Sequence, residues 1–135
     1  MIPYKKPTGF IRSMGQAIRG IIYTWRTQRH LQIHLTAAII VVICGWLTKV
    51  SRFEWLALIF AIGSVIAAEV INTAIEIVVD LVEPNFHPMA GMAKDIAAGT
   101  VLVAVIQAVI IGLVVFGPHL LNLLRRYLST VSIIP

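Results

Sequence analysis

The chain has 135 residues, enough for one compact unit, and 59% of them are hydrophobic while only 13% are charged. A soluble domain carries roughly a quarter charged residues, so this composition and a mean hydropathy of +0.90 favour an integral membrane protein. The net charge of +5 is spread toward the chain ends, which favours anionic lipid headgroups as a partner and excludes nucleic acid from our expectations.

Residues 8–30 have the pattern of an amphipathic helix. Apolar side chains recur there at helical spacing, and four arginines occupy the other positions. In a chain without a soluble core, this pattern is typical of a helix that lies on the membrane surface. The apolar residues are Phe10, Met14, Ala17, Ile18, Ile21, Ile22 and Trp25, and the arginines are Arg12, Arg19, Arg26 and Arg29.

Three apolar segments follow and predict transmembrane helices at residues 33–47, 53–82 and 96–115. A span needs about 20 residues, so the polar second half of the middle segment is expected to project towards water. Gly117 and Pro118 predict a helix stop after the third segment. The predicted fold is therefore all-α, an integral membrane bundle of three transmembrane helices preceded by an amphipathic surface helix.

This pattern divides the chain into a basic surface helix at residues 1–30, a three-helix core at 31–118 and a C-terminal tail at 119–135. Positive charge predicts the orientation of the bundle. With the N-terminus inside, the inner segments hold seven lysines and arginines and the outer segments hold four. We therefore expect a multi-pass protein of the inner (cytoplasmic) membrane, with the N-terminus and the loop at residues 83–95 on the cytoplasmic side.

The middle membrane segment carries a polar stripe. Glu69, Asn72, Glu76 and Asp80 follow one another at steps of three, four and four residues, which keeps them on one helix face. Carboxylates in a membrane helix are costly unless they are paired, metal-bound or hydrated. Interhelical hydrogen bonds are the structural alternative, most of all for Asp80 near the helix end. Three carboxylates and an amide on one stripe favour a functional site.

Lys94 and Asp95 lie beyond the following loop, where the third membrane helix is expected to open. Asp95 in that place also suits a helix N-cap, which is a structural role. A lysine close to several carboxylates suits contact with phosphate. The stripe and this lysine together describe a site for metal-bound phosphate at the cytoplasmic face.

Two stretches resemble the small prokaryotic diacylglycerol kinase family. Residues 69–80, EVINTAIEIVVD, resemble its signature, and residues 93–101, AKDIAAGTV, resemble its second block. The loop at residues 82–88, VEPNFHP, looks more like the undecaprenol kinase branch. The resemblance covers residues 8–118. It implies an enzyme of lipid metabolism, a homotrimer with shared sites, that transfers the γ-phosphate of ATP to undecaprenol or diacylglycerol.

The resemblance also implies roles for single residues. Glu69 matches the position proposed as general base for the lipid hydroxyl, and Glu76 matches a carboxylate that holds Mg²⁺. Asn72, Lys94 and Asp95 match residues of the nucleotide and phosphate site. These roles agree with what phosphoryl transfer needs, which is positioning, charge neutralisation by Mg²⁺ and an oriented hydroxyl.

At one position the sequence departs from the family pattern. The family normally places a second metal-binding glutamate in the N-terminal amphipathic helix, whereas this chain has Gln28 there and no Asp or Glu in residues 1–53. The amide oxygen of Gln28 can ligate Mg²⁺ but brings no negative charge, so we expect weaker Mg²⁺ binding.

Two other functions stay open at this point. A catalytically silent family member that binds nucleotide or lipid would account for the missing glutamate. A purely structural bundle or transporter subunit would leave the polar stripe unexplained. His30 and His34, four residues apart, suit interfacial polar residues better than a metal-binding pair.

Overall fold

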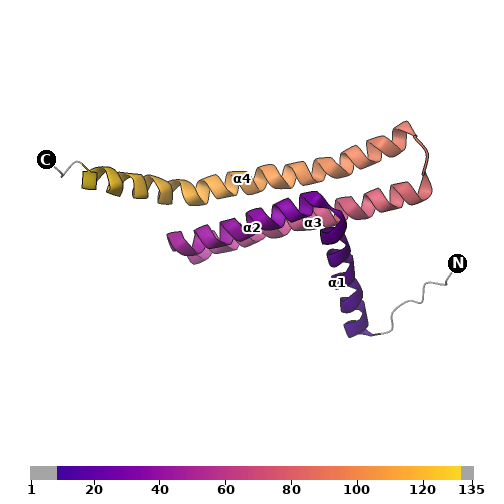
Figure 1. Cartoon of the computed structure of the whole chain (residues 1–135), viewed down its shortest axis with the longest axis horizontal. Coiled ribbons are helices and arrows are strands. Elements are labelled where there is room, and N and C mark those ends of the chain that lie inside the picture. Colours follow the sequence, from indigo (N-terminus) through magenta and orange to yellow (C-terminus); the bar gives the residue numbers. More distant parts are fainter. Residues whose placement is uncertain (1–8, 132–135) are drawn as a thin grey trace.

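The computed structural model describes the backbone of residues 9–131 and the side chains of residues 9–129. Three helices lie alongside one another, and a fourth leaves the bundle at a steep angle (Figure 1). The three aligned helices are long and apolar enough to span a membrane, which confirms the predicted bundle. The elements are α1 (Phe10–Thr27), α2 (Arg29–Thr48), α3 (Arg52–Val82) and α4 (Pro88–Val131).

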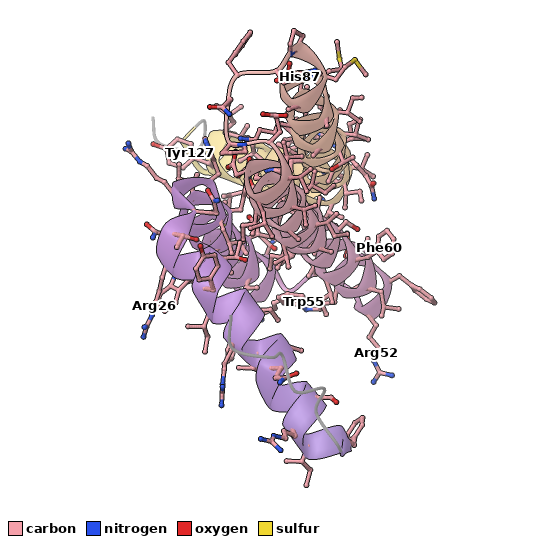
Figure 2. All side chains as sticks on the ribbon, turned by 90° about the vertical axis from the view of Figure 1, so that its right-hand side faces the viewer. Arg26, Arg52, Trp55, Phe60, His87 and Tyr127 are labelled. Carbon is pink, nitrogen blue, oxygen red and sulfur yellow. The ribbon has the colours of Figure 1, made fainter. Side chains whose placement is uncertain are left out.

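Large apolar side chains cover the outer faces of the three long helices. Phe60 of α3 is 66% exposed and points away from the bundle (Figure 2). Trp46 of α2 and Leu113 of α4 are exposed in the same way. A soluble monomer rarely presents so much continuous apolar surface, whereas lipid tails cover it in a bilayer. The surface therefore agrees with the membrane assignment made from composition.

The helix α1 meets the bundle only near its C-terminal end. Gln28 separates α1 from α2 with an extended backbone, and its N–H donates to the carbonyl of Thr24. Thr24 and Leu31, on either side of this break, are buried. The apolar residues nearer the start of α1, such as Phe10 and Ile18, stay exposed. This arrangement fits the surface helix expected from the sequence and places Gln28 against the bundle.

The turn between α2 and α3 is fixed by a capping box. The Ser51 hydroxyl accepts the N–H of Glu54, and a Glu54 carboxylate oxygen accepts the N–H of Ser51. The other carboxylate oxygen of Glu54 lies 3.1 Å from His119 Nε2 on α4. The start of α3 is thereby tied to α4. Nearby, a Cβ at Gly45 would come within 2.9 Å of the Trp55 ring, so the glycine lets this ring lie directly against the backbone of α2.

The helix α4 corrects two predictions. It begins at Pro88, where a proline suits the first turn because the N–H it lacks has no helical partner. Asp95 therefore lies inside the helix and is not an N-cap. The helix also continues through Gly117 and Pro118 to Val131, so the predicted stop is wrong. Membrane helices tolerate proline because neighbouring groups can satisfy the backbone carbonyl that it leaves free.

Candidate active site

The polar stripe of α3 runs from a buried to an exposed environment. Glu69 and Asn72 are only 4% and 8% exposed, Glu76 is half-buried and Asp80 is exposed. Polar side chains from α2, from α4 and from the junction of α1 and α2 contact the stripe. The structure therefore places these residues on one face of α3, as predicted. This face lies against other parts of the protein and is not turned only towards lipid.

Glu69 lies at the buried end, opposite α2. Its carboxylate oxygen Oε1 is 3.2 Å from His34 Nε2, and the two side chains are 5% and 22% exposed. The backbone carbonyl of Glu69 accepts a hydrogen bond from the Thr73 hydroxyl at 2.9 Å. Within residues 9–129, the Glu69 carboxylate makes no hydrogen bond, and His34 is the side chain that contacts it across the interface of α2 and α3. This contact could not be predicted from the sequence, which shows only that a histidine lies near the membrane boundary.

Glu76 lies one helical turn past Asn72 and joins α3 to the junction of α1 and α2. The Asn72 amide donates to Glu76 Oε1 at 2.9 Å, and the Gln28 amide donates to Glu76 Oε2 at 3.3 Å. The fold thus brings Gln28 to the carboxylate that the resemblance pairs with it. In this arrangement Gln28 offers a hydrogen-bond donor to the carboxylate, and its amide must turn over before its oxygen can face a cation.

Asn72 carries a buried oxygen without a partner. Its Nδ2 is committed to Glu76, and among the described residues its Oδ1 accepts no hydrogen bond. A buried polar atom left unpaired costs about 1–3 kcal/mol, which is tolerated more readily where a ligand completes the bonding. The open oxygen therefore marks the vicinity of Glu76 as a place for a hydrogen-bond donor or a cation.

The donor set around Glu76 fits Mg²⁺ that arrives with a nucleotide. Within the described part of the chain, no group of three or more His, Cys, Asp or Glu residues could hold a metal. Glu76, Asn72 and Gln28 offer one carboxylate and two amide oxygens. Mg²⁺ in phosphotransfer sites is commonly held by one or two carboxylates, substrate phosphates and waters, so this set suffices without a dedicated cage.

Lys94 reaches the exposed end of the stripe. Its ammonium forms an ion pair with Asp80, and the two side chains are 37% and 63% exposed. This pair and the turn that carries His87 together line a polar cavity of about 260 Å³. Asp95 is exposed on α4 and, within residues 9–129, has no hydrogen bond or ion pair with the stripe. The fold therefore joins Lys94 to the stripe but leaves Asp95 apart from it.

An apolar cavity of about 260 Å³ lies between α2, α3 and α4. Among the described residues that line it, His34 is the polar one, and Val65 and Ile66 line it one turn before Glu69. The cavity therefore extends along the helices from the level of Glu69 towards the opposite membrane face. Its remaining lining is aliphatic and aromatic, with Val41, Leu58, Ala61, Val105, Gly112 and Phe116 among its residues.

Comparisons with known proteins show the family to which the chain belongs. The family model for prokaryotic diacylglycerol kinase matches residues 15–116. Undecaprenol kinase of Bacillus subtilis (strain 168) is 46% identical over 111 residues, which cover 82% of this chain and 90% of that protein. Diacylglycerol kinase of Escherichia coli (strain K12) is 30% identical over 115 residues, covering 83% and 94%. Diacylglycerol kinase of Synechocystis is 38% identical over 113 residues, covering 83% and 65%. The chain belongs to the prokaryotic diacylglycerol kinase family of membrane lipid kinases.

Proposed function

We propose that this protein transfers the γ-phosphate of ATP to a membrane lipid alcohol, with an isoprenoid alcohol such as undecaprenol preferred over diacylglycerol. One observation carries the proposal. The buried carboxylate of Glu69 lies between an apolar cavity on one side and the Asn72–Glu76 pair on the other. A lipid hydroxyl and a nucleotide phosphate can therefore meet beside it. The similarity to an undecaprenol kinase supports the choice of lipid.

In the proposed reaction Glu69 acts as general base. The lipid O–H bond breaks as its proton passes to a Glu69 carboxylate oxygen, and the lipid oxygen bonds to the γ-phosphorus. The bond from that phosphorus to the β–γ bridging oxygen breaks, and ADP leaves with the electron pair. The absence of a hydrogen bond to the Glu69 carboxylate among the described residues leaves its oxygens available for this proton.

The half-buried part of the stripe is suited to the nucleotide. Glu76, with Asn72 and Gln28, would hold Mg²⁺, which neutralises phosphate charge when it is bound. Lys94 pairs with Asp80 in an exposed position, where an ion pair is weak enough to exchange for a phosphate. Asp95, on the surface of α4, is proposed to contact the nucleotide only once it is bound.

The lipid chain is proposed to occupy the apolar cavity between α2, α3 and α4. His34 at the stripe end would then lie near the hydroxyl, and the aliphatic lining would contact the first part of the chain. We further propose that α1 lies at the cytoplasmic membrane surface, because the seven-to-four bias of basic residues places the N-terminus inside. A homotrimer in the inner membrane completes the proposal and rests on the family resemblance.

Lipid choice tests the proposal. Purified protein in mixed micelles receives undecaprenol and diacylglycerol in equal amounts with γ-labelled ATP and Mg²⁺, and the two lipid products are counted separately. We expect more label in undecaprenyl phosphate. Label only in the diacylglycerol product would reject the isoprenoid preference.

Gln28 motivates one alternative proposal, which is that the protein is a catalytically silent family member that binds nucleotide without transferring phosphate. Calorimetry of ATP and Mg²⁺ binding to the same preparation separates the two functions. Binding without labelled lipid, while the Bacillus subtilis relative labels lipid in the same micelles, would favour the silent member.

A further inference from the structure

We propose that His34 is a positioning residue that holds the Glu69 carboxylate in the orientation needed for proton abstraction. This inference rests on the proposed function. His34 Nε2 and Glu69 Oε1 lie 3.2 Å apart across the interface of α2 and α3, and the Glu69 side chain is 5% exposed. A polar group this close to a buried carboxylate limits the orientations that the carboxylate can adopt, and His34 is the group in that position.

The contact leaves the reactive part of the carboxylate free. Oε1 lies next to the imidazole nitrogen Nε2, which leaves the second oxygen for the lipid hydroxyl. Within residues 9–129 no side chain hydrogen-bonds to this carboxylate, so the contact with His34 on one side is what restrains its rotation.

His34 also lines the apolar cavity in which the lipid chain is proposed to lie. Its side chain is therefore in contact with the space from which the hydroxyl approaches and with the group that receives the proton. A hydroxyl that enters along this cavity passes the imidazole before it reaches Glu69. This double placement distinguishes His34 from a histidine that merely joins two helices.

A double-mutant cycle tests the proposal. His34→Ala, Glu69→Gln and the double variant are assayed for kcat and for the KM of ATP, with undecaprenol as acceptor. We expect His34→Ala to lower kcat by about 10- to 100-fold with the KM of ATP within about twofold, because the reacting group is misplaced but the nucleotide site is intact. In the Glu69→Gln background the same change is expected to alter the residual kcat by less than about twofold.

Two more variants keep the test decisive if the Glu69→Gln protein is too slow to measure. His34→Gln retains a donor and is expected to recover most of the kcat that His34→Ala loses. His30→Gln changes an exposed histidine one turn away on α2 and is expected to leave kcat unchanged. Detergent gel filtration and the thermal midpoint of each variant identify any that fail to fold.

The proposal would be overturned if His34→Ala lowered kcat equally in the wild-type and Glu69→Gln backgrounds. A residue that acts through Glu69 should have no further effect once the Glu69 carboxylate has been replaced. Wild-type kcat in His34→Ala would overturn it as well, as would equal loss in folded His34→Gln and His34→Ala. If the unmodified protein phosphorylates neither lipid, the proposed function itself fails, and that result is separate from all three.

Discussion

Two glutamate–histidine pairs join α3 to its neighbours, and their surroundings differ. At the start of α3, Glu54 Oε1 lies 3.1 Å from His119 Nε2, with side chains 29% and 27% exposed. Further along, Glu69 Oε1 lies 3.2 Å from His34 Nε2, with the Glu69 side chain only 5% exposed. The chemical groups and the distances are nearly the same. Burial and the remaining contacts therefore have to explain any difference in role.

The other contacts of the two carboxylates favour a structural role for Glu54 and a chemical role for Glu69. Both carboxylate oxygens of Glu54 are engaged, one by His119 and the other by the backbone N–H of Ser51. Among the described residues Glu69 has no such second contact, and a cavity opens beside its histidine. A carboxylate whose oxygens are all bound holds a helix in place, whereas one with a free oxygen in a dry site can accept a proton.

The largest expected effect separates the two glutamates directly. Glu69→Gln removes the proposed base without changing the size of the side chain, so kcat should fall about 10²- to 10⁴-fold while the fold is retained. Glu54→Gln is the matched control and should keep kcat near the wild-type value. Steady-state phosphorylation of undecaprenol measures both, and similar losses in the two variants would remove the distinction between the pairs.

The next effect concerns the half-buried carboxylate. Glu76→Gln removes the one charged group of the proposed Mg²⁺ site, so the Mg²⁺ concentration at half-maximal rate should rise at least about tenfold. A Mg²⁺ titration of the phosphorylation rate at saturating lipid measures it. An unchanged Mg²⁺ requirement would place the cation elsewhere.

A smaller change in the Mg²⁺ requirement, a decrease, is expected from a substitution at the junction of α1 and α2. Gln28→Glu replaces an amide that donates to Glu76 by a second carboxylate, so the half-maximal Mg²⁺ concentration should fall, by about tenfold if the charge is fully used. Gln32→Glu is the control, because Gln32 is exposed and donates instead to the carbonyl of Trp25. Equal Mg²⁺ curves for the wild type and Gln28→Glu would exclude position 28 from the metal.

The smallest effect is structural. His119→Ala removes one contact of an already capped helix start, so the thermal midpoint in detergent should fall by a few degrees with kcat unchanged. Circular dichroism during heating measures the shift. A large loss of activity in a folded His119→Ala protein would mean that this pair also serves the reaction.

Much of this fold follows from apolar length and periodicity. The length of the apolar segments predicted the three spans, and the 3.6-residue spacing predicted the surface helix and the face shared by Glu69, Asn72 and Glu76. The helix stop at Pro118 was wrong because a signal that ends helices in water is weaker in a membrane bundle. The start of α4 was placed too late because Lys94 and Asp95 precede the long apolar run, and the helix begins seven residues before Asp95, at Pro88.

The contacts between helices could not be predicted from the sequence. Whether His34 or His30 meets Glu69 depends on how α2 slides and turns against α3, and nothing in either helix alone fixes that register. The same holds for His119, which lies 65 residues from Glu54. The meeting of Gln28 with Glu76 was expected only through the family resemblance, and the extended backbone at Gln28 shows how the chain achieves it.

Transfer of labelled γ-phosphate from ATP to undecaprenol by the purified chain shows whether Glu69 is the base of a lipid kinase. Wild type and Glu69→Gln are followed side by side in the same mixed micelles with Mg²⁺, with the Bacillus subtilis relative as positive control. We expect labelled undecaprenyl phosphate from the wild type and at most about one hundredth of that rate from Glu69→Gln. Equal rates from the two proteins would mean that Glu69 is not the base.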